Sequence, residues 1–219
     1  MIKYLPYSEQ HHLKTNNLLW LLIALMAILV FPAFSIIFND YTPLIFNICY
    51  SLVIIAGIYI VTDSKLHLFI GSILGASSLF FIWSGINHNS FQPFSRLLFF
   101  TFLAYQIVSI IIRSDVVTLN LIYGAIIGYM LIGLIGGQLC LILDNFEPNS
   151  FLSQKELTPY SYLYFAFVSL TTLGFGDIVP QNDAARGITL LIAFLGQIYL
   201  TTLIAILVGA YLRQEKKQI

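Results

Sequence analysis

Charged residues are scarce in this chain: only 9% of its 219 residues are Asp, Glu, Lys or Arg. A typical soluble domain has about 25% charged residues. Hydrophobic side chains reach 58%, and the mean hydropathy is +0.87. These charges are too few to cover the surface of a water-soluble domain, so the composition excludes a cytosolic enzyme and a disordered protein.

An excess of either sign of charge is also missing. Ten Lys and Arg residues balance ten Asp and Glu residues, which leaves no surplus of positive charge for nucleic-acid phosphates. Cys49 and Cys140 both lie inside apolar runs, so neither a disulfide framework nor a metal cluster is expected. No pair of His, Cys or acidic residues falls in the middle of an apolar run. We therefore expect no enzyme, no organic cofactor and no nucleic-acid partner.

Long hydrophobic runs are what the sequence has in abundance. A helix that crosses a membrane needs about 20 mostly apolar residues. Six runs of about this length predict an all-α integral membrane protein with six transmembrane helices in contact with membrane lipids. No repeat of several helices is found, which disfavours a secondary transporter. The runs cover residues 17–38, 44–61, 66–86, 93–112, 117–143 and 184–212.

A further apolar segment, residues 159–172, is too short to cross. Its length as a helix is roughly 21 Å, against about 30 Å for the hydrocarbon core. Thr158 followed by Pro159 is typical of a helix start. We therefore expect a short helix that enters the membrane and turns back, followed by backbone that is buried in protein or lines water.

The positive charges predict the orientation, because cytoplasmic loops carry more Lys and Arg. With both termini in the cytoplasm, the inner side holds Lys3, Lys14, Lys65, Arg113, Arg213, Lys216 and Lys217. The outer side then holds Arg96, Lys155 and Arg186. The short helix would enter from the outside, where an acidic mouth concentrates cations. The acidic residues on that side are Asp40, Asp144, Glu147, Glu156, Asp177 and Asp183.

The segment after the short helix reads Thr172-Leu173-Gly174-Phe175-Gly176-Asp177. Glycine adopts backbone angles that are closed to other residues. Alternating glycine and non-glycine residues can therefore aim successive carbonyl groups in one direction, which a helix or a strand cannot do. The plainer interpretation is a glycine-rich turn between two ordinary helices.

Residues 160–180 resemble the pore loop of tetrameric potassium channels, whose signature is Thr-x-Gly-Tyr/Phe-Gly-Asp. Leu173 stands where Val or Ile is commoner, and Phe175 where Tyr is commoner. The resemblance covers about residues 117–212, and the first four predicted helices show no comparable motif. It implies a homotetramer around a central pore, because four copies are needed to surround one ion.

The resemblance also implies the function and the site. The chain would be a potassium-selective channel that conducts K⁺ passively, with a less selective monovalent cation channel on the same scaffold as the alternative. K⁺ would bind the carbonyl oxygens of the first four filter residues and the Thr172 hydroxyl. Asp177 would sit at the outer mouth, with Thr171 supporting the filter and Tyr164 either bonding to Asp177 or simply packing. The filter itself would comprise Thr172, Leu173, Gly174, Phe175 and Gly176.

The last apolar run contains the candidates for gating. Gly196 lies where many potassium channels carry a hinge glycine in the inner helix, although close helix packing also uses glycine in membranes. Gln197, Thr201, Ile204 and Val208 recur at helical spacing and are expected to face the cavity. The last two would form an apolar constriction that closes by dewetting.

The front of the chain lacks the expected marks of a voltage sensor. Residues 1–116 are predicted to form a four-helix domain with a sensor-like layout, and residues 117–219 the pore domain. The fourth run carries Arg96 but no repeated basic residues, so strong voltage dependence is not expected. Arg96 is expected to snorkel to the outer interface. We expect no cytoplasmic gating domain on this chain, and a prokaryotic inner membrane as its location.

Overall fold

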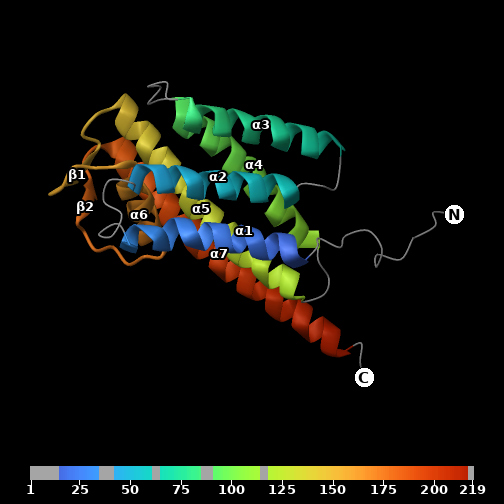
Figure 1. The fold of residues 1–219 in the computed structure, drawn as a ribbon. Helices are drawn as coiled ribbons and strands as arrows, with labels where there is room; N and C mark the ends of the chain where they lie inside the picture. Colours follow the sequence, from blue (N-terminus) through green and yellow to red (C-terminus); the bar gives the residue numbers. More distant parts are fainter. Residues whose placement is uncertain (1–14, 35–41, 61–64, 85–90, 114–117, 217–219) are drawn as a thin grey trace.

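The computed structural model describes residues 15–34, 42–60, 65–84, 91–113 and 118–216. The long helices run side by side and alternate in direction along the chain, while the short helix and the two strands gather at one end (Figure 1). The elements are α1 (Thr15–Val30), η2 (Phe31–Phe34), α2 (Thr42–Ile60), α3 (Lys65–Trp83), α4 (Phe91–Arg113), α5 (Leu119–Phe146), β1 (Phe151–Ser153), α6 (Pro159–Leu170), β2 (Ile178–Pro180) and α7 (Asp183–Lys216).

Five helices among the described residues, α2, α3, α4, α5 and α7, are long and apolar enough to cross a membrane. The first predicted run is shorter than expected: α1 ends at Val30, and a 3₁₀ turn follows. Pro32 lies in that turn, and proline has no N–H to donate within a continuing α-helix. The chain is thus an integral membrane protein, while the helix lengths leave a sixth crossing by α1 unconfirmed.

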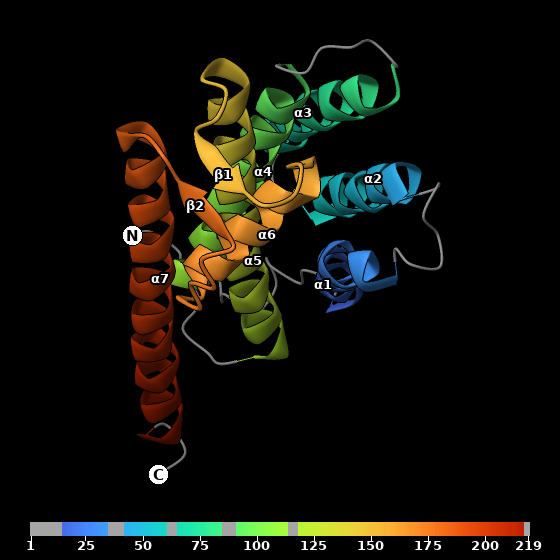
Figure 2. The ribbon, with the colours of Figure 1, turned by 90° about the vertical axis from the view of Figure 1, so that its left-hand side faces the viewer.

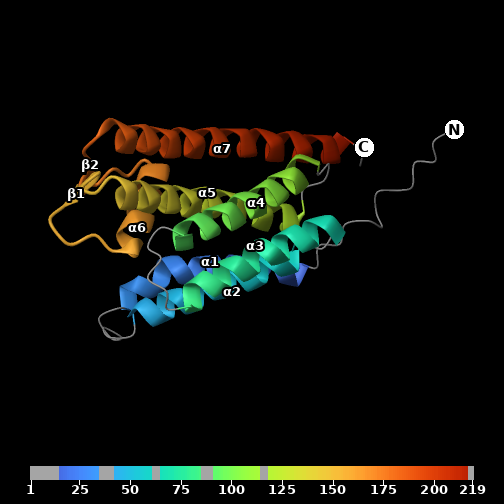
Figure 3. The ribbon, with the colours of Figure 1, turned by 90° about the horizontal axis from the view of Figure 1, so that it is seen from above.

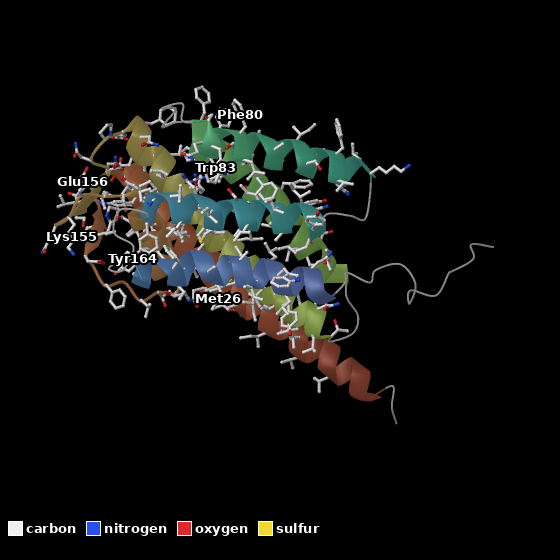
Figure 4. The ribbon with its side chains drawn as sticks, in the orientation of Figure 1. Met26, Phe80, Trp83, Lys155, Glu156 and Tyr164 are labelled. Carbon is white, nitrogen blue, oxygen red and sulfur yellow. The ribbon has the colours of Figure 1, made fainter. Side chains whose placement is uncertain are left out.

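The outer surfaces of the front helices are apolar. Met26 on α1 and Phe80 and Trp83 on α3 are exposed (Figure 4). In water such side chains would be costly, but in a bilayer they meet lipid. The exposed apolar surface therefore agrees with contact between this part of the chain and membrane lipids.

Helix α5 is the centre of the fold, with α4 and α6 in the same layer, α7 on one side and α1, α2 and α3 on the other (Figures 2 and 3). Small residues on α5 allow the close approach of α6. A Cβ at Gly133 would lie 2.6 Å from the ring of Phe167, and one at Gly137 would lie 3.0 Å from the Cα of Leu163. The glycines of α5 therefore determine how closely the short helix is seated.

Arg96 is buried inside the helix bundle, so the expectation that its side chain snorkels out to the interface is wrong. Its side chain is only 3% exposed, and its guanidinium carbon lies 4.3 Å from the centre of the Tyr50 ring. Tyr50 on α2 is itself held by Gln138 on α5, whose Nε2 donates a hydrogen bond of 3.2 Å to the Tyr50 hydroxyl. The face of the tyrosine ring attracts the cation, which gives it a partner inside the bundle.

Several predictions lie outside the described residues. The boundary between the two predicted domains, at residues 116 and 117, falls in one such gap. Four of the charges used to predict orientation do so as well, namely Lys3, Lys14, Asp40 and Lys217. The division into a front domain and a pore domain therefore stays a prediction.

Candidate functional site

The short helix begins where the sequence predicts. Thr158 caps it: its hydroxyl accepts from the backbone N–H of Ser161, and its own N–H donates to the Ser161 hydroxyl at 3.0 Å. This reciprocal pair, with Pro159 in the first turn, satisfies N–H groups that the helix leaves free. Helix α6 ends at Leu170, two residues before the predicted end. Its 12 residues span about 18 Å, which is too short to cross a membrane.

The loop after α6 is tied back onto the end of the helix. A helix leaves its last four carbonyl groups without partners inside the helix. Here the backbone N–H groups of the loop residues take up three of them, at N···O distances of 3.0 to 3.1 Å. The pairs are Thr171 to Phe167, Leu173 to Val168 and Thr172 to Ser169. The Thr171 hydroxyl adds a bond of 2.6 Å to the Phe167 carbonyl, and its role in supporting a filter stays a prediction.

The backbone φ angle of the loop is positive at every second residue. Thr172, Gly174 and Gly176 have φ angles of 59°, 59° and 76°, while Leu173 and Phe175 between them do not have positive φ. The two glycines were expected to adopt such angles, because they lack a Cβ. Thr172 was not expected to do so, and a positive φ is an outlier for a β-branched residue. Backbone that alternates in this way can present its carbonyl groups on one side.

The whole loop from Thr171 to Asp177 is exposed in the single chain. Leu173 and Phe175 are 60% and 65% exposed, and nothing lies within 4 Å of a Cβ added at either glycine. Non-helical backbone at membrane depth is stable only when protein buries it or water lines it. Exposed backbone of this kind would therefore have to line water or be covered by other protein.

Two carboxylates lie beside tyrosine side chains of α6. Burial and the neighbouring Asp177 carboxylate raise the pKa of Tyr164, and the bond from its hydroxyl to Asp177 stays a prediction. Asp144 accepts hydrogen bonds from the Tyr162 hydroxyl at 2.5 Å and from the Ser150 N–H at 2.9 Å. Tyr164 lies at the end of the molecule that also carries Lys155 and Glu156 (Figure 4). Sequence reasoning missed that Tyr162 and Ser150 bind Asp144, because no local sequence pattern marks these two hydrogen bonds.

The strand β2 follows the loop directly and is paired with β1 in antiparallel register. Ser153 pairs with Ile178 and Phe151 with Pro180. The pairing fastens the chain after Asp177 to the segment that leads into α6. The loop is thus held at both ends, at its start by α6 and at its end by the small sheet.

The proposed gating residues share one exposed face of α7. Gln197, Thr201, Ile204 and Val208 are all exposed in the single chain, and their spacing of four, three and four residues places them on one side of the helix. Gly196 lies on the packed face instead, where an added Cβ would be 2.6 Å from the Leu170 carbonyl oxygen. This contact gives Gly196 a packing role, and its role as a hinge stays a prediction.

Comparison with known proteins finds a similarity to channel domains in this part of the chain. Residues 116–213 match a family model described as an ion channel. The TWiK family of potassium channels protein 7 from Caenorhabditis elegans is 40% identical over 64 residues, which cover 27% of this chain and 11% of that relative. No solved structure matches the chain.

The matched family describes a channel and not an enzyme, in agreement with the expectation from the sequence. The chain spans about a tenth of the length of the curated relative, as the 11% coverage states. That relative comes from an animal, so it does not support the expected prokaryotic membrane.

Proposed function

We propose that the chain forms a potassium-selective channel that conducts K⁺ passively across a membrane. The observation that carries this proposal is the alternating backbone of Thr172, Gly174 and Gly176. It follows a short helix that is too short to cross, inside the segment matched by the ion channel model. The partial relative named as a potassium channel supports K⁺ as the transported ion.

The ions would bind mainly to backbone oxygens. Carbonyl groups of Thr172, Leu173, Gly174 and Phe175, with the Thr172 hydroxyl, would replace the water shell of a dehydrating K⁺. Gly176 would complete the turn at the outer end of the filter. K⁺ enters this proposal as the transported ion, and no group of three or more His, Cys, Asp or Glu residues able to hold a metal is found among the described residues.

A homotetramer is the assembly that we propose, because one ion must be surrounded. The exposed loop and the exposed face of α7 support this, since four copies around an axis would cover Leu173 and Phe175 and enclose Ile204 and Val208. The carboxyl end of each α6 helix would then direct its partial negative charge toward the axis, which favours a cation there. Both termini are proposed to face the cytoplasm.

We propose no strong voltage dependence, because the fourth helix carries only Arg96 and, at its last residue, Arg113, with no repeat of basic residues between them. Gating would then come from lipid, membrane tension, a partner or the filter itself, or the pore would stay open. We also propose that Gly196 is the hinge and that Ile204 and Val208 form the constriction. Val208→Asp should hold the constriction hydrated, and unchanged closure in single-channel records would contradict a gate there.

The test of selectivity is a reversal potential. The full chain would be placed in planar bilayers under opposed K⁺ and Na⁺ gradients. A reversal near the K⁺ equilibrium potential supports the proposal, and a value midway between the two equilibria favours the less selective cation channel. A reversal near the Na⁺ equilibrium, or the absence of any conductance, would contradict both.

A further inference from the structure

The last carbonyl group of α6 differs from the three before it. Those of Phe167, Val168 and Ser169 accept hydrogen bonds from the loop that follows them. The Leu170 carbonyl accepts instead from the hydroxyl of Tyr129 on α5, with 3.2 Å between the two oxygens and 41 residues between them in sequence. The end of the pore helix is therefore held from outside the loop.

A third helix meets the same carbonyl group. Gly196 of α7 lies so close that a Cβ there would be 2.6 Å from the Leu170 oxygen and 2.8 Å from Leu170 Cδ1. Helices α5, α6 and α7 thus converge on one oxygen atom. A side chain at position 196 would therefore force the Leu170 carbonyl, the Leu170 side chain or α7 itself to shift.

Leu170 stands two residues before the first strained position of the loop. Thr172 holds a φ of 59°, which is costly for a β-branched residue and persists only where the surroundings enforce it. Part of that enforcement is the bond from the Thr172 N–H to Ser169, directly beside Leu170. A shift of the Leu170 carbonyl would therefore be passed to the backbone of Thr172.

We propose that Tyr129 is a positioning residue for the filter. Its hydroxyl fixes the Leu170 carbonyl and, through it, the backbone of Thr172, while the absence of a side chain at Gly196 keeps the space that this bond needs. Tyr129 itself touches no ion. The inference rests on the proposed function, since it assigns a role within the proposed potassium filter.

The chain offers a matched control in Tyr199. Tyr199 is on α7, and its hydroxyl donates a hydrogen bond of 2.8 Å to the backbone carbonyl of Ala125 on α5. The rings of Tyr129 and Tyr199 are 6.0 Å apart, so the two tyrosines share one environment. Removal of either hydroxyl takes away one hydrogen bond to a backbone carbonyl, but only Tyr129 is bonded to α6.

The experiment compares Tyr129→Phe, Tyr199→Phe and the unaltered full chain in planar bilayers, with the Na⁺ to K⁺ permeability ratio as the readout. We expect Tyr129→Phe to raise that ratio about five-fold, the equivalent of one ordinary hydrogen bond, and Tyr199→Phe to leave it unchanged. Equal shifts in both variants would assign the effect to general packing, and no shift in Tyr129→Phe would overturn the positioning role. Loss of K⁺ selectivity in the unaltered chain would instead refute the proposed function.

A second pair of variants keeps the inference testable if Tyr129→Phe fails to assemble. Gly196→Ala presses on the same carbonyl and should raise the permeability ratio in the same direction. Gly209→Ala, on the same helix but with nothing within 4 Å, should not. An effect of Gly196→Ala confined to the frequency of opening, with the ratio unchanged, would contradict the part of Gly196 in positioning the filter and leave only the hinge role proposed above.

Discussion

The segment α5 to α7 and the front helices α1 to α4 use polar groups in opposite ways. In the first, the polar groups that matter belong mostly to the backbone, and tyrosine and threonine hydroxyls hold them in place. In the second, one buried cation, Arg96, faces an aromatic ring, and the described residues provide no carboxylate within ion-pairing distance of it. Its Nε atom and Gln138 Oε1 both lack hydrogen-bond partners. A count of charged residues therefore finds Arg96 in the front helices. It overlooks the polar groups of the candidate filter, because most of them belong to the backbone.

The largest effect should come from the backbone of the loop. Gly174→Ala places a Cβ on a residue with a φ of 59°, a conformation that L side chains rarely adopt, even though the space around it is open. We expect the reversal potential to move away from the K⁺ equilibrium by at least the equivalent of a ten-fold loss of selectivity. Each of the four proposed copies would carry the strain.

The control for that variant is Gly187→Ala. Gly187 also has nothing within 4 Å, but it lies in the helix α7, where alanine is favoured. Selectivity should be unchanged there. A Gly174→Ala channel as selective as the unaltered one would mean that the alternating backbone does not set the ion sites.

The second largest effect should come from the contact between Arg96 and Tyr50. Tyr50→Leu leaves a buried cation without its aromatic partner, and we expect a loss of about 2 kcal/mol in the free energy of unfolding. Arg96→Gln removes the cation together with its cost of burial, so its effect should be smaller.

The double variant tests whether the two residues act as a pair. If they do, the variant with both changes should be about as stable as Arg96→Gln alone, with a coupling energy of about 2 kcal/mol. The measurement is the thermal midpoint of the detergent-solubilised protein. Strictly additive losses would show that the contact contributes nothing beyond packing.

The sequence predicts the parts of the fold whose cause is local. Runs of about 20 apolar residues predict the long helices, and Thr158 with Pro159 predicts the start of α6. The alternating glycines predict the turn of the candidate filter. The bond from Tyr129 to Leu170 and the burial of Arg96 against Tyr50 join residues 41 and 46 positions apart, so no local spacing marks them. The positive φ of Thr172 was missed because the glycine rule points only to positions 174 and 176.

A smaller effect should appear at high pH through Tyr162. Burial, the hydrogen bond to Asp144 and the charge of that carboxylate raise the pKa of Tyr162 above its usual value. A group whose pKa is higher in the folded state stabilises the fold below its unfolded pKa, which is about 10 for tyrosine. That contribution is lost as the pH rises above 10. Thermal midpoints should therefore fall less steeply above pH 10 in Tyr162→Phe than in the unaltered protein, and identical slopes would contradict the assignment.

The smallest effect should come from an arginine in the region that contains the candidate filter. Arg186 forms an ion pair with Asp183 at 3.4 Å, but both side chains are well exposed, so water and salt screen the attraction. Arg186→Gln should leave the thermal midpoint unchanged within error, at low salt as well as high. The same substitution at Arg96 removes a cation that is 3% exposed and should change the midpoint measurably. Equal responses at the two positions would mean that burial does not distinguish these arginines, and the contrast between the two regions would then rest on the backbone of the loop alone.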